Sequence, residues 1–576
     1  MNDELVSRRD LDFLLRDWLK IDHDALGDFL DLSERLAVDE FLPHYKLADR
    51  EEPSLGPDGV HVCASIGTAL RKYAELGFFG AGFPEETGGL GLPFSVCAAS
   101  YFFFAAANAA TAAYPMLTTA NARLISTFGS AAQVEAFARP QIEGRWFGTM
   151  CLSEPQAGSS LADIRTRAVP DGEDALGRRF RLAGNKMWIS GGDQDVSDNI
   201  VHLALAKVPD ADGRLPEGTP GISLFIVPKF LPDGRRNDIA VAGLNHKMGY
   251  RGTSNCLLNF GEAGGAVGWM VGEPGQGLRQ MFLMMNEARI MVGLGGAAIG
   301  YRSHRLAVRY ARERSQGRRT GERGGAPVAI IEHPDVKRML LAQKSYVEGA
   351  LALSLYCAHL VEREKTDPDA AALLGLLTPV AKTWPSEYGL AANDLAIQIH
   401  GGYGYTRDFD VEQLWRDNRL NPIHEGTTGI QAIDLVGRKI LRDGSGLRLL
   451  EKEVRRSARA GEDVAELTVH ARALLDAWQK ILAATQSLAQ GDEARAFDNA
   501  TPFLQAFGHV VIAWLWLDQA LAARRATGLA GEASFIHGKQ MACCHFFEAE
   551  LPKVEAWLAP MMGRSDVAAR MPASAF

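Results

Sequence analysis

The chain has 576 residues, of which 47% are hydrophobic and 23% are charged, and this balance excludes intrinsic disorder as its main state. Its 61 Lys and Arg residues are outnumbered by 70 Asp and Glu residues, and the resulting net charge of −9 argues against a protein that coats nucleic acid. Seven cysteines are scattered without CxxC pairs, so we expect no disulfide framework, no zinc ribbon and a cytoplasmic location.

The first part of the chain, residues 1–146, is helical in character. Between Asp10 and Leu19 the apolar residues recur at helical spacing. A turn-rich segment, residues 82–93, precedes residues 94–128, whose Ala and Phe content predicts a tightly packed pair of buried helices. The charged N-terminus contains no apolar run, so we expect no targeting sequence.

Residues 147–265 have a different texture and predict a small antiparallel β domain. Three apolar runs have strand character, and turns rich in Gly, Asp and Pro separate them; they are residues 199–208, 221–227 and 256–260. Helical patterns return after this domain and continue through residues 266–442 and 443–576. The predicted order is therefore helical, β, helical and again helical.

Several familiar patterns are absent or misleading. The segment GLGGAAIG (293–300) looks like a dinucleotide-binding motif, but it lacks a preceding strand, so small residues that let helices pack closely are the preferred interpretation. The run Val510–Leu517 is too short to span a bilayer, and we expect a buried helix there and no membrane span. No GxSxG, HExxH or Walker pattern occurs, and the 14 histidines show no metal-ligand spacing, so we expect no metal site.

Three segments are more informative, although none of them identifies a function alone. Residues 151–160 (CLSEPQAGSS) are able to bind polar ligand edges, or they form a turn before a strand. The glycines of residues 397–405 (IQIHGGYGY) allow close approach to a phosphate or ring, or they form a helix C-cap. In residues 423–431, Glu425 is either a general base in an apolar setting or a carboxylate that stabilises a helix N-terminus.

Seven segments occur in the order that is typical of one flavoprotein family. They are CLSEPQAGSS (151–160), KMWISGG (186–192), HKMGYRGTSN (246–255), NEAR (286–289), RERSQGR (312–318), QIHGGYGY (398–405) and HEGTTGIQ (424–431). Through these segments the chain resembles the acyl-CoA dehydrogenase family. With its extension over residues 443–576 it looks most like the longer bacterial members, which include enzymes acting on 3-methylthiopropionyl-CoA.

The resemblance implies a mainly helical fold with a central β domain. Its parts would be an N-terminal helical domain (1–146), a middle β-barrel-like domain (147–265), a C-terminal four-helix domain (266–442) and an additional helical domain (443–576). It also implies that FAD is the cofactor. Because FAD sites of this family straddle subunits, the resemblance implies at least a homodimer.

The resemblance further implies desaturation of an acyl-CoA thioester between Cα and Cβ. In related enzymes a Glu at the position of Glu425 takes the α proton, while the β hydride goes to flavin N5. The backbone N–H of Glu425 would bind the thioester oxygen and stabilise the developing enolate. Substrate binding would exclude water and raise the pKa of Glu425.

Other roles are carried over position by position. The implied cofactor-binding residues are Met150, Leu152, Ser153, Trp188, Ser190, Arg314, Gln316, Gln398, Gly401, Gly402 and Thr427. The implied substrate-binding residues are Ser159, Met285, Arg289, His424 and Gly426. Arg289 resembles an arginine close to the catalytic carboxylate, and Arg314 and Gln316 resemble residues that reach the FAD pyrophosphate of a neighbouring subunit. We expect the acyl pocket along residues 114–121 and near Met284 and Met285.

The chain departs from the family pattern at five positions. Ser160 stands where Asp is common, Met150 and Ser190 where an aromatic residue and Thr are frequent, His424 where Tyr is frequent, and Gly429 where shorter members have a polar residue. A neutral His424 would line the pocket, whereas a charged one would lower the pKa of Glu425. Lining the pocket is the preferred interpretation.

Three functions are weighed against one another. The leading one is an acyl-CoA dehydrogenase that passes electrons to an electron-transfer flavoprotein, and the second is an acyl-CoA oxidase that returns them to oxygen. The third is a non-catalytic DNA-damage-associated flavoprotein. Retention of Glu425 disfavours it, and so do the 15 basic and 16 acidic residues of 441–576, which give no charge for tracking phosphates. We therefore expect no nucleic-acid partner.

Overall fold

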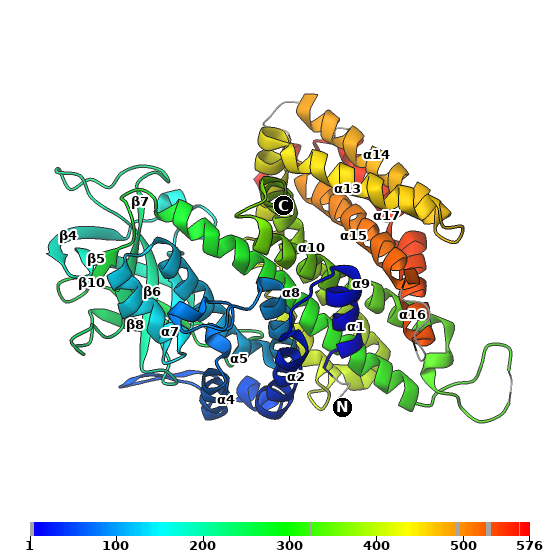
Figure 1. Cartoon of the computed structure of the whole chain (residues 1–576), viewed down its shortest axis with the longest axis horizontal. Coiled ribbons are helices and arrows are strands. Elements are labelled where there is room, and N and C mark those ends of the chain that lie inside the picture. The colour runs from blue at the N-terminus through cyan, green and yellow to red at the C-terminus, as the bar shows by residue number, and fades with distance from the viewer. Residues whose placement is uncertain (1–4, 323, 491–495, 526–531, 564) are drawn as a thin grey trace. The chain divides into compact units, whose positions relative to one another are not determined.

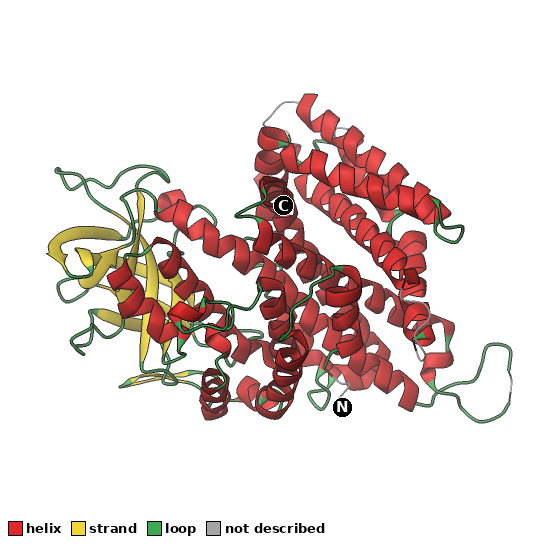
Figure 2. Cartoon of the chain, in the orientation of Figure 1, coloured by secondary structure: helices red, strands yellow, loops and turns green. Residues whose placement is uncertain are grey.

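The computed structural model describes residues 5–322, 324–490, 496–525, 532–563 and 565–576. The chain forms two compact units: the sheet unit, residues 28–288, and the helical unit, residues 1–27 with 289–576. The fold is mainly helical, and the strands of the described residues all lie in the sheet unit (Figures 1 and 2). The predicted fold class is therefore confirmed, while the finer division into four domains stays a prediction.

The helices before the sheet surround a long, bent helix. They are α2 (Leu26–Leu36), α3 (Tyr45–Arg50), α4 (Ala64–Glu75), α5 (Phe94–Phe128), α6 (Ala131–Gln133) and α7 (Arg139–Ile142), with short π or 3₁₀ segments η2 (Ala37–Phe41), η3 (Phe78–Gly80), η4 (Glu85–Thr87) and η5 (Val134–Ala138). A further 3₁₀ segment, η6 (Leu161–Asp163), follows the first strand of the sheet. The backbone of α5 leaves the helical conformation at Asn108, whose side chain accepts from the Thr111 N–H and donates to the Phe41 carbonyl. The predicted pair of buried helices is thus two helical stretches joined by a kink.

The strands form one hairpin and one sheet that closes on itself. They are β1 (Ser54–Gly56), β2 (Gly59–His61), β3 (Trp146–Cys151), β4 (Arg167–Asp174), β5 (Gly177–Ser190), β6 (Asn199–Lys207), β7 (Ile222–Pro228), β8 (Ile239–Leu244), β9 (Asn255–Phe260) and β10 (Ala266–Met270). The sheet order is β10-β7-β6-β4-β5-β9-β8, and a further β10–β5 pairing gives the β-barrel-like closure. The predicted antiparallel domain needs correction, because β3 and β4 both pair with β6 in parallel.

Strands β6 and β7 are buried along their whole length. Successive side chains of a strand point to opposite faces of the sheet. On β6, Leu203 and Leu205 belong to one apolar cluster together with Leu124 of α5, whereas Ala204 and Ala206 belong to a second cluster inside the closed sheet. Both faces are therefore covered, which explains why these strands appear in the sequence as continuous apolar runs.

Three long helices build the body of the helical unit: α8 (Gly277–Glu313), α9 (Pro334–Arg363) and α10 (Pro368–His400). The shorter helical segments of this body are α1 (Arg8–Asp12), α11 (Val411–Asn418), α12 (Thr428–Ile433), η1 (Phe13–Trp18), η7 (Ile330–Glu332), η8 (Gly401–Tyr405) and η9 (Asp434–Asp443). Glycines of the GLGGAAIG segment lie directly against α10: a Cβ on Gly293 would stand 1.9 Å from the Ala381 carbonyl oxygen. The interpretation of this segment as a close helix contact is confirmed.

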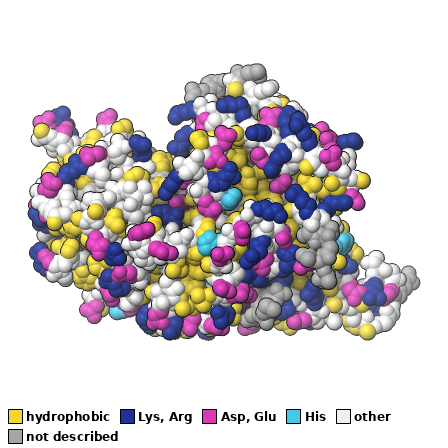
Figure 3. Space-filling model, viewed as in Figure 1, with side chains coloured by type: hydrophobic (Ala, Val, Ile, Leu, Met, Phe, Trp, Pro, Cys, Tyr) yellow, Lys and Arg dark blue, Asp and Glu magenta, His cyan; other side chains and the backbone are white. Residues whose placement is uncertain are grey.

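The C-terminal extension adds a further layer of helices to this unit. They are α13 (Ser445–Glu462), α14 (Thr468–Gln490), α15 (Ala500–Arg525), α16 (Ala533–His545), α17 (Lys553–Met562) and α18 (Val567–Arg570), with η11 (Phe546–Glu550) and η12 (Ala573–Ala575). Helix α15 packs against α13, α14 and α17 (Figure 1). On the visible face of the extension, basic and acidic side chains are intermingled (Figure 3), in keeping with their near balance in the sequence.

A buried ion cluster joins the extension to the helical body. The ammonium of Lys539 (α16) forms ion pairs with Asp10 (α1) and, at 2.9 Å, with Glu348 (α9). All three side chains are buried, and the Tyr301 hydroxyl donates to Asp10 at 3.0 Å. Buried charges persist only where they are paired and hydrogen-bonded, so this cluster fixes three segments to one another.

Among the residues that the structure describes, three helices are long and apolar enough to cross a membrane by length and composition: α5, α8 and α15. Their most apolar windows are 94%, 72% and 83% buried inside the structure, so packing within the protein accounts for their composition. The run Val510–Leu517 lies within α15 and is buried, as predicted, but the helix around it is longer than the run itself. The absence of a membrane span stays a prediction.

We predict that Gly293→Ala destabilises the protein by about 1–3 kcal/mol, because the new methyl group would force α8 and α10 apart. The matched control is Gly375→Ala on α10, where a Cβ meets only the Lys439 Nζ at 3.7 Å. That change should be neutral or stabilise by up to about 1 kcal/mol through helix propensity. Urea unfolding followed by circular dichroism measures both, and equal stability of Gly293→Ala and wild type would contradict the close contact.

Candidate active site

Glu425 lies in a turn between α11 and α12 with a φ of 55°, in the left-handed region. This conformation costs a non-glycine residue about 1–2 kcal/mol. The Gln431 side-chain amide donates to the Glu425 carbonyl at 2.9 Å, and a Cβ on Gly426 would lie 2.7 Å from that amide nitrogen. Gly426 therefore leaves room for Gln431 to hold the strained turn, and strain of this kind is typical of functional sites.

The Glu425 carboxyl is partly buried and lies within the electrostatic field of two cations. Burial raises its pKa above the ordinary value, while the fields of Arg289 and Lys382 lower it. Among the described residues, no partner forms an ion pair with Glu425. A carboxyl in this state is able to exchange a proton closer to neutral pH than an exposed one.

Lys382 of α10 is a residue of this site that the sequence analysis missed. Its side chain is fully buried, and its Nζ has no hydrogen-bond partner in the described structure. Burial lowers its pKa to about 8, although Glu425 and Glu387 raise it. Glu387, also on α10, accepts a hydrogen bond from the Thr428 hydroxyl at 2.5 Å, which links α10 to the start of α12.

Arg289 is held away from an ion pair with Glu425. Its guanidinium donates to Asp434 at 3.1 Å, and Asp434 also accepts from Arg438 at 2.6 Å. The Arg289 side chain is buried, and its Nε is without a hydrogen-bond partner in the described structure. Arg289 is thus near Glu425, as predicted, and it acts on the carboxyl through its electrostatic field and not through an ion pair.

His424, which precedes Glu425, is neutral. Burial first, and then the charge of Lys382, lower its pKa to about 3. Its Nε2 lies 3.1 Å from the Oδ1 of Asn421. Of the two forms of His424 that the sequence left open, this low pKa favours the uncharged imidazole, while its place along the acyl pocket stays a prediction.

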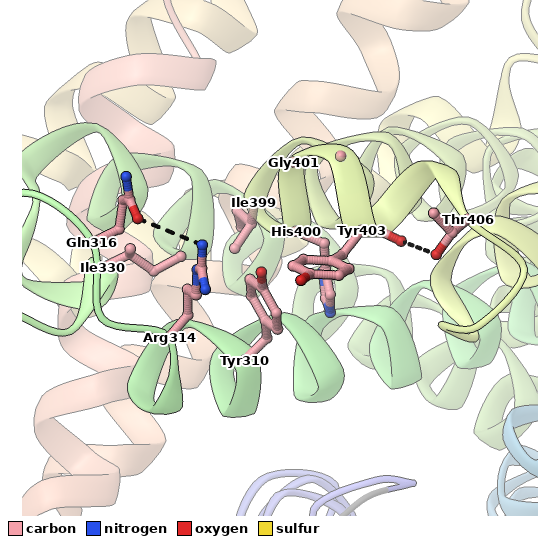
Figure 4. A pocket seen from close by; sticks show the side chains of 10 residues that line it. Tyr310, Arg314, Gln316, Ile330, Ile399, His400, Gly401, Tyr403 and Thr406 are labelled. Atoms are coloured by element: carbon pink, nitrogen blue, oxygen red, sulfur yellow. Dashed lines mark hydrogen bonds between the residues drawn. The ribbon is translucent and has the colours of Figure 1, made fainter.

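A pocket of about 460 Å³ lies in the helical unit between α8, η7 and η8 (Figure 4). Its lining consists of Tyr310, Arg314, Gln316, Ile330, Ile399, His400, Gly401, Gly402, Tyr403 and Thr406. Arg314 donates to Gln316 at 3.5 Å and its guanidinium lies 5.9 Å from the Tyr403 ring centre. A Cβ on Gly401 or Gly402 would meet nothing within 4 Å, so their backbone is open to a ligand.

The pocket gathers four of the six residues of the helical unit that were expected to bind the cofactor. Gln398 is exposed in the last turn of α10 and does not line the pocket; its carbonyl accepts the Gly401 N–H. Thr427 is the residue before α12, and its side chain makes no capping hydrogen bond. Neither residue is brought to the pocket.

In the sheet unit, the Leu152–Ser153 segment is held by strand β5. Lys186 donates to the Leu152 carbonyl at 3.0 Å, and the Met187 N–H donates to the Ser153 carbonyl at 3.0 Å. Lys186 is buried and also pairs with Glu154 at 3.0 Å. Although burial raises it, the Lys186 charge and hydrogen bonds hold the pKa of Glu154 at about 2.

The same strand exposes Trp188. Its register against β9 shifts between Lys186 and Ile189, and Trp188 in this irregularity has a φ of 65° and a side chain that is 59% exposed. A large aromatic ring held in the left-handed region and in solvent is costly for a fold alone and suits a ring-binding surface. Ser190 follows, and its hydroxyl accepts from Asn255 at 3.2 Å.

Of the remaining predicted residues of the sheet unit, the methionines belong to or pack against one apolar cluster, whereas Ser159 is exposed. Met150 is partly buried on β3, beside Leu203 of β6, and Ser159 is exposed in the loop that follows. Met284 is buried in the apolar cluster around β6 and Met285 packs against it. Within residues 114–121, Tyr114, Thr118 and Asn121 bind backbone groups of the sheet and its loops, so these three side chains fasten α5 rather than form a pocket surface.

Nothing in the described part of the chain suggests metal or thiol chemistry. No group of three or more His, Cys, Asp or Glu side chains in that part is placed to hold a metal ion. All seven cysteines are free, and burial raises the pKa of Cys151 and Cys256 to about 12. Such thiols are not nucleophilic at neutral pH.

Four family models match consecutive parts of the chain. Acyl-CoA dehydrogenase, N-terminal domain, matches residues 28–145; the middle domain matches 149–263; the C-terminal domain matches 275–441. A model described as Acetyl-CoA dehydrogenase C-terminal like matches residues 450–572, within the extension.

Curated relatives cover nearly the whole chain. A 3-methylmercaptopropionyl-CoA dehydrogenase of Ruegeria pomeroyi is 35% identical over 91% of this chain and 90% of its own length. A broad-specificity linear acyl-CoA dehydrogenase of Mycobacterium tuberculosis is 33% identical over 92% of this chain and 91% of its own. A butyryl-CoA dehydrogenase of Syntrophomonas wolfei is 30% identical over 99% of both chains.

Solved structures share the fold. An acyl-CoA dehydrogenase of Bacillus anthracis, complexed with FAD, superposes with a TM-score of 0.76 at 21% identity over 99% of this chain and 93% of that chain. ACDH-11 of Caenorhabditis elegans, in complex with C11-CoA, also has a TM-score of 0.76 at 21% identity, over 98% of this chain and 93% of that chain.

We predict that the Lys186–Glu154 pair is required as a pair. Lys186→Met would leave the Glu154 carboxylate buried without its cation, a loss of about 3–5 kcal/mol in the free energy of unfolding. The double variant Lys186→Met/Glu154→Gln removes both charges and should be clearly more stable than Lys186→Met alone. Thermal unfolding at neutral pH measures both, and a double variant as unstable as the sum of the two single variants would contradict the coupling.

Proposed function

This chain belongs to the acyl-CoA dehydrogenase family, and we propose that it catalyses the FAD-dependent α,β-desaturation of an acyl-CoA thioester. The observation that carries the proposal is the state of Glu425: a partly buried carboxyl with a raised pKa, in a strained turn, without an ion-pair partner among the described residues. Removal of a weakly acidic α proton requires a base whose pKa approaches the working pH. The carboxyl of Glu425 meets that requirement.

In the proposed reaction the ionised Glu425 takes the α proton and becomes a carboxylic acid. The electrons of the broken Cα–H bond form the Cα–Cβ double bond as the hydride leaves Cβ. Bound FAD supplies the acceptor for that hydride at flavin N5. The Glu425 backbone N–H donates to the thioester oxygen and stabilises the charge that develops there. The Gln431 hydrogen bond keeps the turn in one orientation while this happens.

The residues present suit FAD. The pocket combines one guanidinium, one amide and two glycines with open backbone, which is a donor set for a diphosphate. The exposed ring of Trp188 supplies a face for an aromatic ring. In the proposal, Gly401 and Gly402 bind the adenine half of FAD, and Arg314 and Gln316 reach the pyrophosphate of the FAD of a neighbouring subunit. Leu152, Ser153, Trp188 and Ser190 lie along the flavin ring.

We also propose an acyl-CoA substrate, an electron-transfer flavoprotein as the acceptor, a homodimer and a cytoplasmic location. The names of the relatives support the substrate class, because they act on 3-methylmercaptopropionyl-CoA, linear acyl-CoA and butyryl-CoA. The seven free cysteines are in keeping with a reducing compartment. In this proposal Arg289, His424 and Gly426 border the thioester.

We predict that Glu425→Gln retains bound FAD but loses reduction of the flavin by substrate. The amide keeps the size of the side chain and cannot accept the α proton, so the rate of anaerobic flavin bleaching should fall by at least about 10²-fold. The control is Asp394→Asn, an exposed carboxylate on the same helical unit, which should bleach like wild type.

The same assay, with a panel of short, medium, long, branched and thioether acyl-CoAs, decides among the alternatives. Full bleaching of Glu425→Gln would refute Glu425 as the base. Peroxide formation in air without an added acceptor would favour an oxidase. Retardation of DNA at moderate salt, with no bleaching by any acyl-CoA, would favour the non-catalytic flavoprotein.

We predict that the activity falls on the acid side as Glu425 becomes protonated, at a higher pH than for an ordinary glutamate, because its pKa is raised. Lys382→Met removes a cation that lowers this pKa, so the acid limb of kcat/KM should move to still higher pH. Stability should not fall, since the lost ammonium was buried without a hydrogen-bond partner. The exposed Lys337→Met should leave the limb in place, and an unmoved limb in Lys382→Met would contradict the assigned coupling.

A further inference from the structure

A row of buried side-chain amides leads from α8 and α10 to the residue beside Glu425. The Nε2 of His424 lies 3.1 Å from the Oδ1 of Asn421, and the Nδ2 of Asn421 donates to the Oδ1 of Asn418 at 2.8 Å. The Nδ2 of Asn418 donates to the Oδ1 of Asn393 at 2.6 Å. All three asparagines are buried. We call Asn393, Asn418 and Asn421 the asparagine row.

Two backbone carbonyls of α8 fix the direction of the asparagine row. The Nδ2 of Asn418 lies 3.0 Å from the Gly296 carbonyl oxygen, and the Nδ2 of Asn393 lies 3.3 Å from the Ile299 carbonyl oxygen. A carbonyl oxygen only accepts, so the atoms that face it must be the NH₂ groups of the amides. Each amide therefore turns its oxygen toward the next residue of the row. The Nδ2 of Asn393 also lies 2.5 Å from the Ser303 hydroxyl, which takes either role.

This direction determines which nitrogen of His424 carries a proton. Because Asn421 presents its oxygen to His424, the facing Nε2 must be the N–H, and in a neutral imidazole the Nδ1 is then unprotonated. Burial and Lys382 disfavour the charged ring, in agreement with this tautomer. The position of the proton on His424 thus depends on two carbonyls of α8. The Gly296 carbonyl acts through Asn418 and Asn421, and the Ile299 carbonyl acts through Asn393 as well.

The glycines that bring α8 close to α10 also leave space for Asn418 to reach the Gly296 carbonyl. A Cβ on Gly389 would stand 2.3 Å from the Gly296 carbonyl oxygen and 3.1 Å from the Asn418 Nδ2. A Cβ on Gly296 would lie 3.3 Å from the Asn418 Oδ1. Small residues at both positions therefore leave the space in which Asn418 reaches the backbone of α8.

The protonation of His424 matters because the groups around Glu425 already include two cations that lower its pKa. Arg289 from α8 and Lys382 from α10 already lower the pKa of Glu425, and Asp434 of η9 is occupied by Arg289 and Arg438. Glu387 of α10, a further carboxylate of this group, accepts a hydrogen bond from the Thr428 hydroxyl. An imidazolium at His424 would add a third cation next to Glu425 and would weaken it further as a base.

We infer that the asparagine row is a positioning device that holds His424 as the neutral Nε2–H tautomer, so that no third cation stands beside Glu425. The hydrogen bonds place a proton on Nε2, and the burial of His424 near Lys382 disfavours a second proton on Nδ1. The consequence of this tautomer for catalysis rests on the proposed function, in which Glu425 is the base.

The tautomer is tested by ¹⁵N magnetic resonance of histidine-labelled protein, in which the His424 signals are assigned by their loss in His424→Gln. We expect a protonated Nε2 and an unprotonated Nδ1 that do not change between about pH 5 and about pH 8, the range in which an unperturbed histidine titrates. A protonated Nδ1, or titration of His424 within this range, would overturn the inference. This measurement needs no altered asparagine and no activity.

The consequence is tested with Asn421→Asp, which places a carboxylate opposite Nε2 and should make His424 doubly protonated in the same spectra. The acid limb of kcat/KM should then move to lower pH, and kcat should fall by up to about tenfold as the base weakens. The double variant Asn421→Asp/His424→Gln lacks the imidazolium and should return the limb toward wild type. The matched control is Asn393→Asp, the same change at the far end of the row, which should leave His424 neutral.

The two readouts separate the inference from the proposed function. A neutral His424 in Asn421→Asp would overturn the inference. A charged His424 in that variant, with an acid limb that stays in place, would support the control of His424 by the row and would contradict Glu425 as the base.

Discussion

The site depends on keeping one carboxylate ionisable but without an ion-pair partner. Glu425 is near enough to Arg289 and Lys382 to feel both charges, yet it forms an ion pair with neither. Three features maintain this state: the left-handed turn, the Gln431 hydrogen bond and the commitment of Arg289 to Asp434. If either cation closed on Glu425, the carboxyl would lose the raised pKa that makes it a base. Much of the local structure therefore keeps Glu425 from forming an ion pair with Arg289 or Lys382.

The sequence predicted site residues that lie within recognisable motifs. It missed residues whose role depends on a contact with another element of the fold. Glu425, Trp188 and the glycines of η8 were found because they lie in segments that resemble those of the acyl-CoA dehydrogenase family, whereas the residues alone left Glu425 open as a base or a helix-end carboxylate. Lys382 could not be found, since a buried lysine in an apolar helix has no local signature and gains meaning only from Glu425, on another element. Asn421 and Asn418 look like ordinary turn and helix-end residues in one dimension. Gln431 was within a quoted motif, but its contact with the Glu425 carbonyl exists only after the chain turns.

The same distinction applies to the fold. Strands β6, β7 and β9 were recognised because burial on both faces or at the core gives apolar runs. Strand β5 was missed, because it carries arginines, Gly184 and an irregular register that obscure the alternation of strand residues. The parallel pairing of β3 with β6 is also invisible locally, because β4 and β5 intervene in the sequence and the partners are chosen by the closure of the sheet.

The buried cluster of Lys539, Asp10 and Glu348 bears on how such a chain gains or loses its last helices during evolution. A gene cut before α13 would remove the ammonium that the two carboxylates share and the helix that covers them. Glu348 would keep its ion pair with Lys344 of α9, whereas Asp10 would keep the Tyr301 hydrogen bond and lose its cation. A shortened chain would therefore be favoured by a substitution at position 10, so that loss of the last helices and change near the N-terminus would support each other.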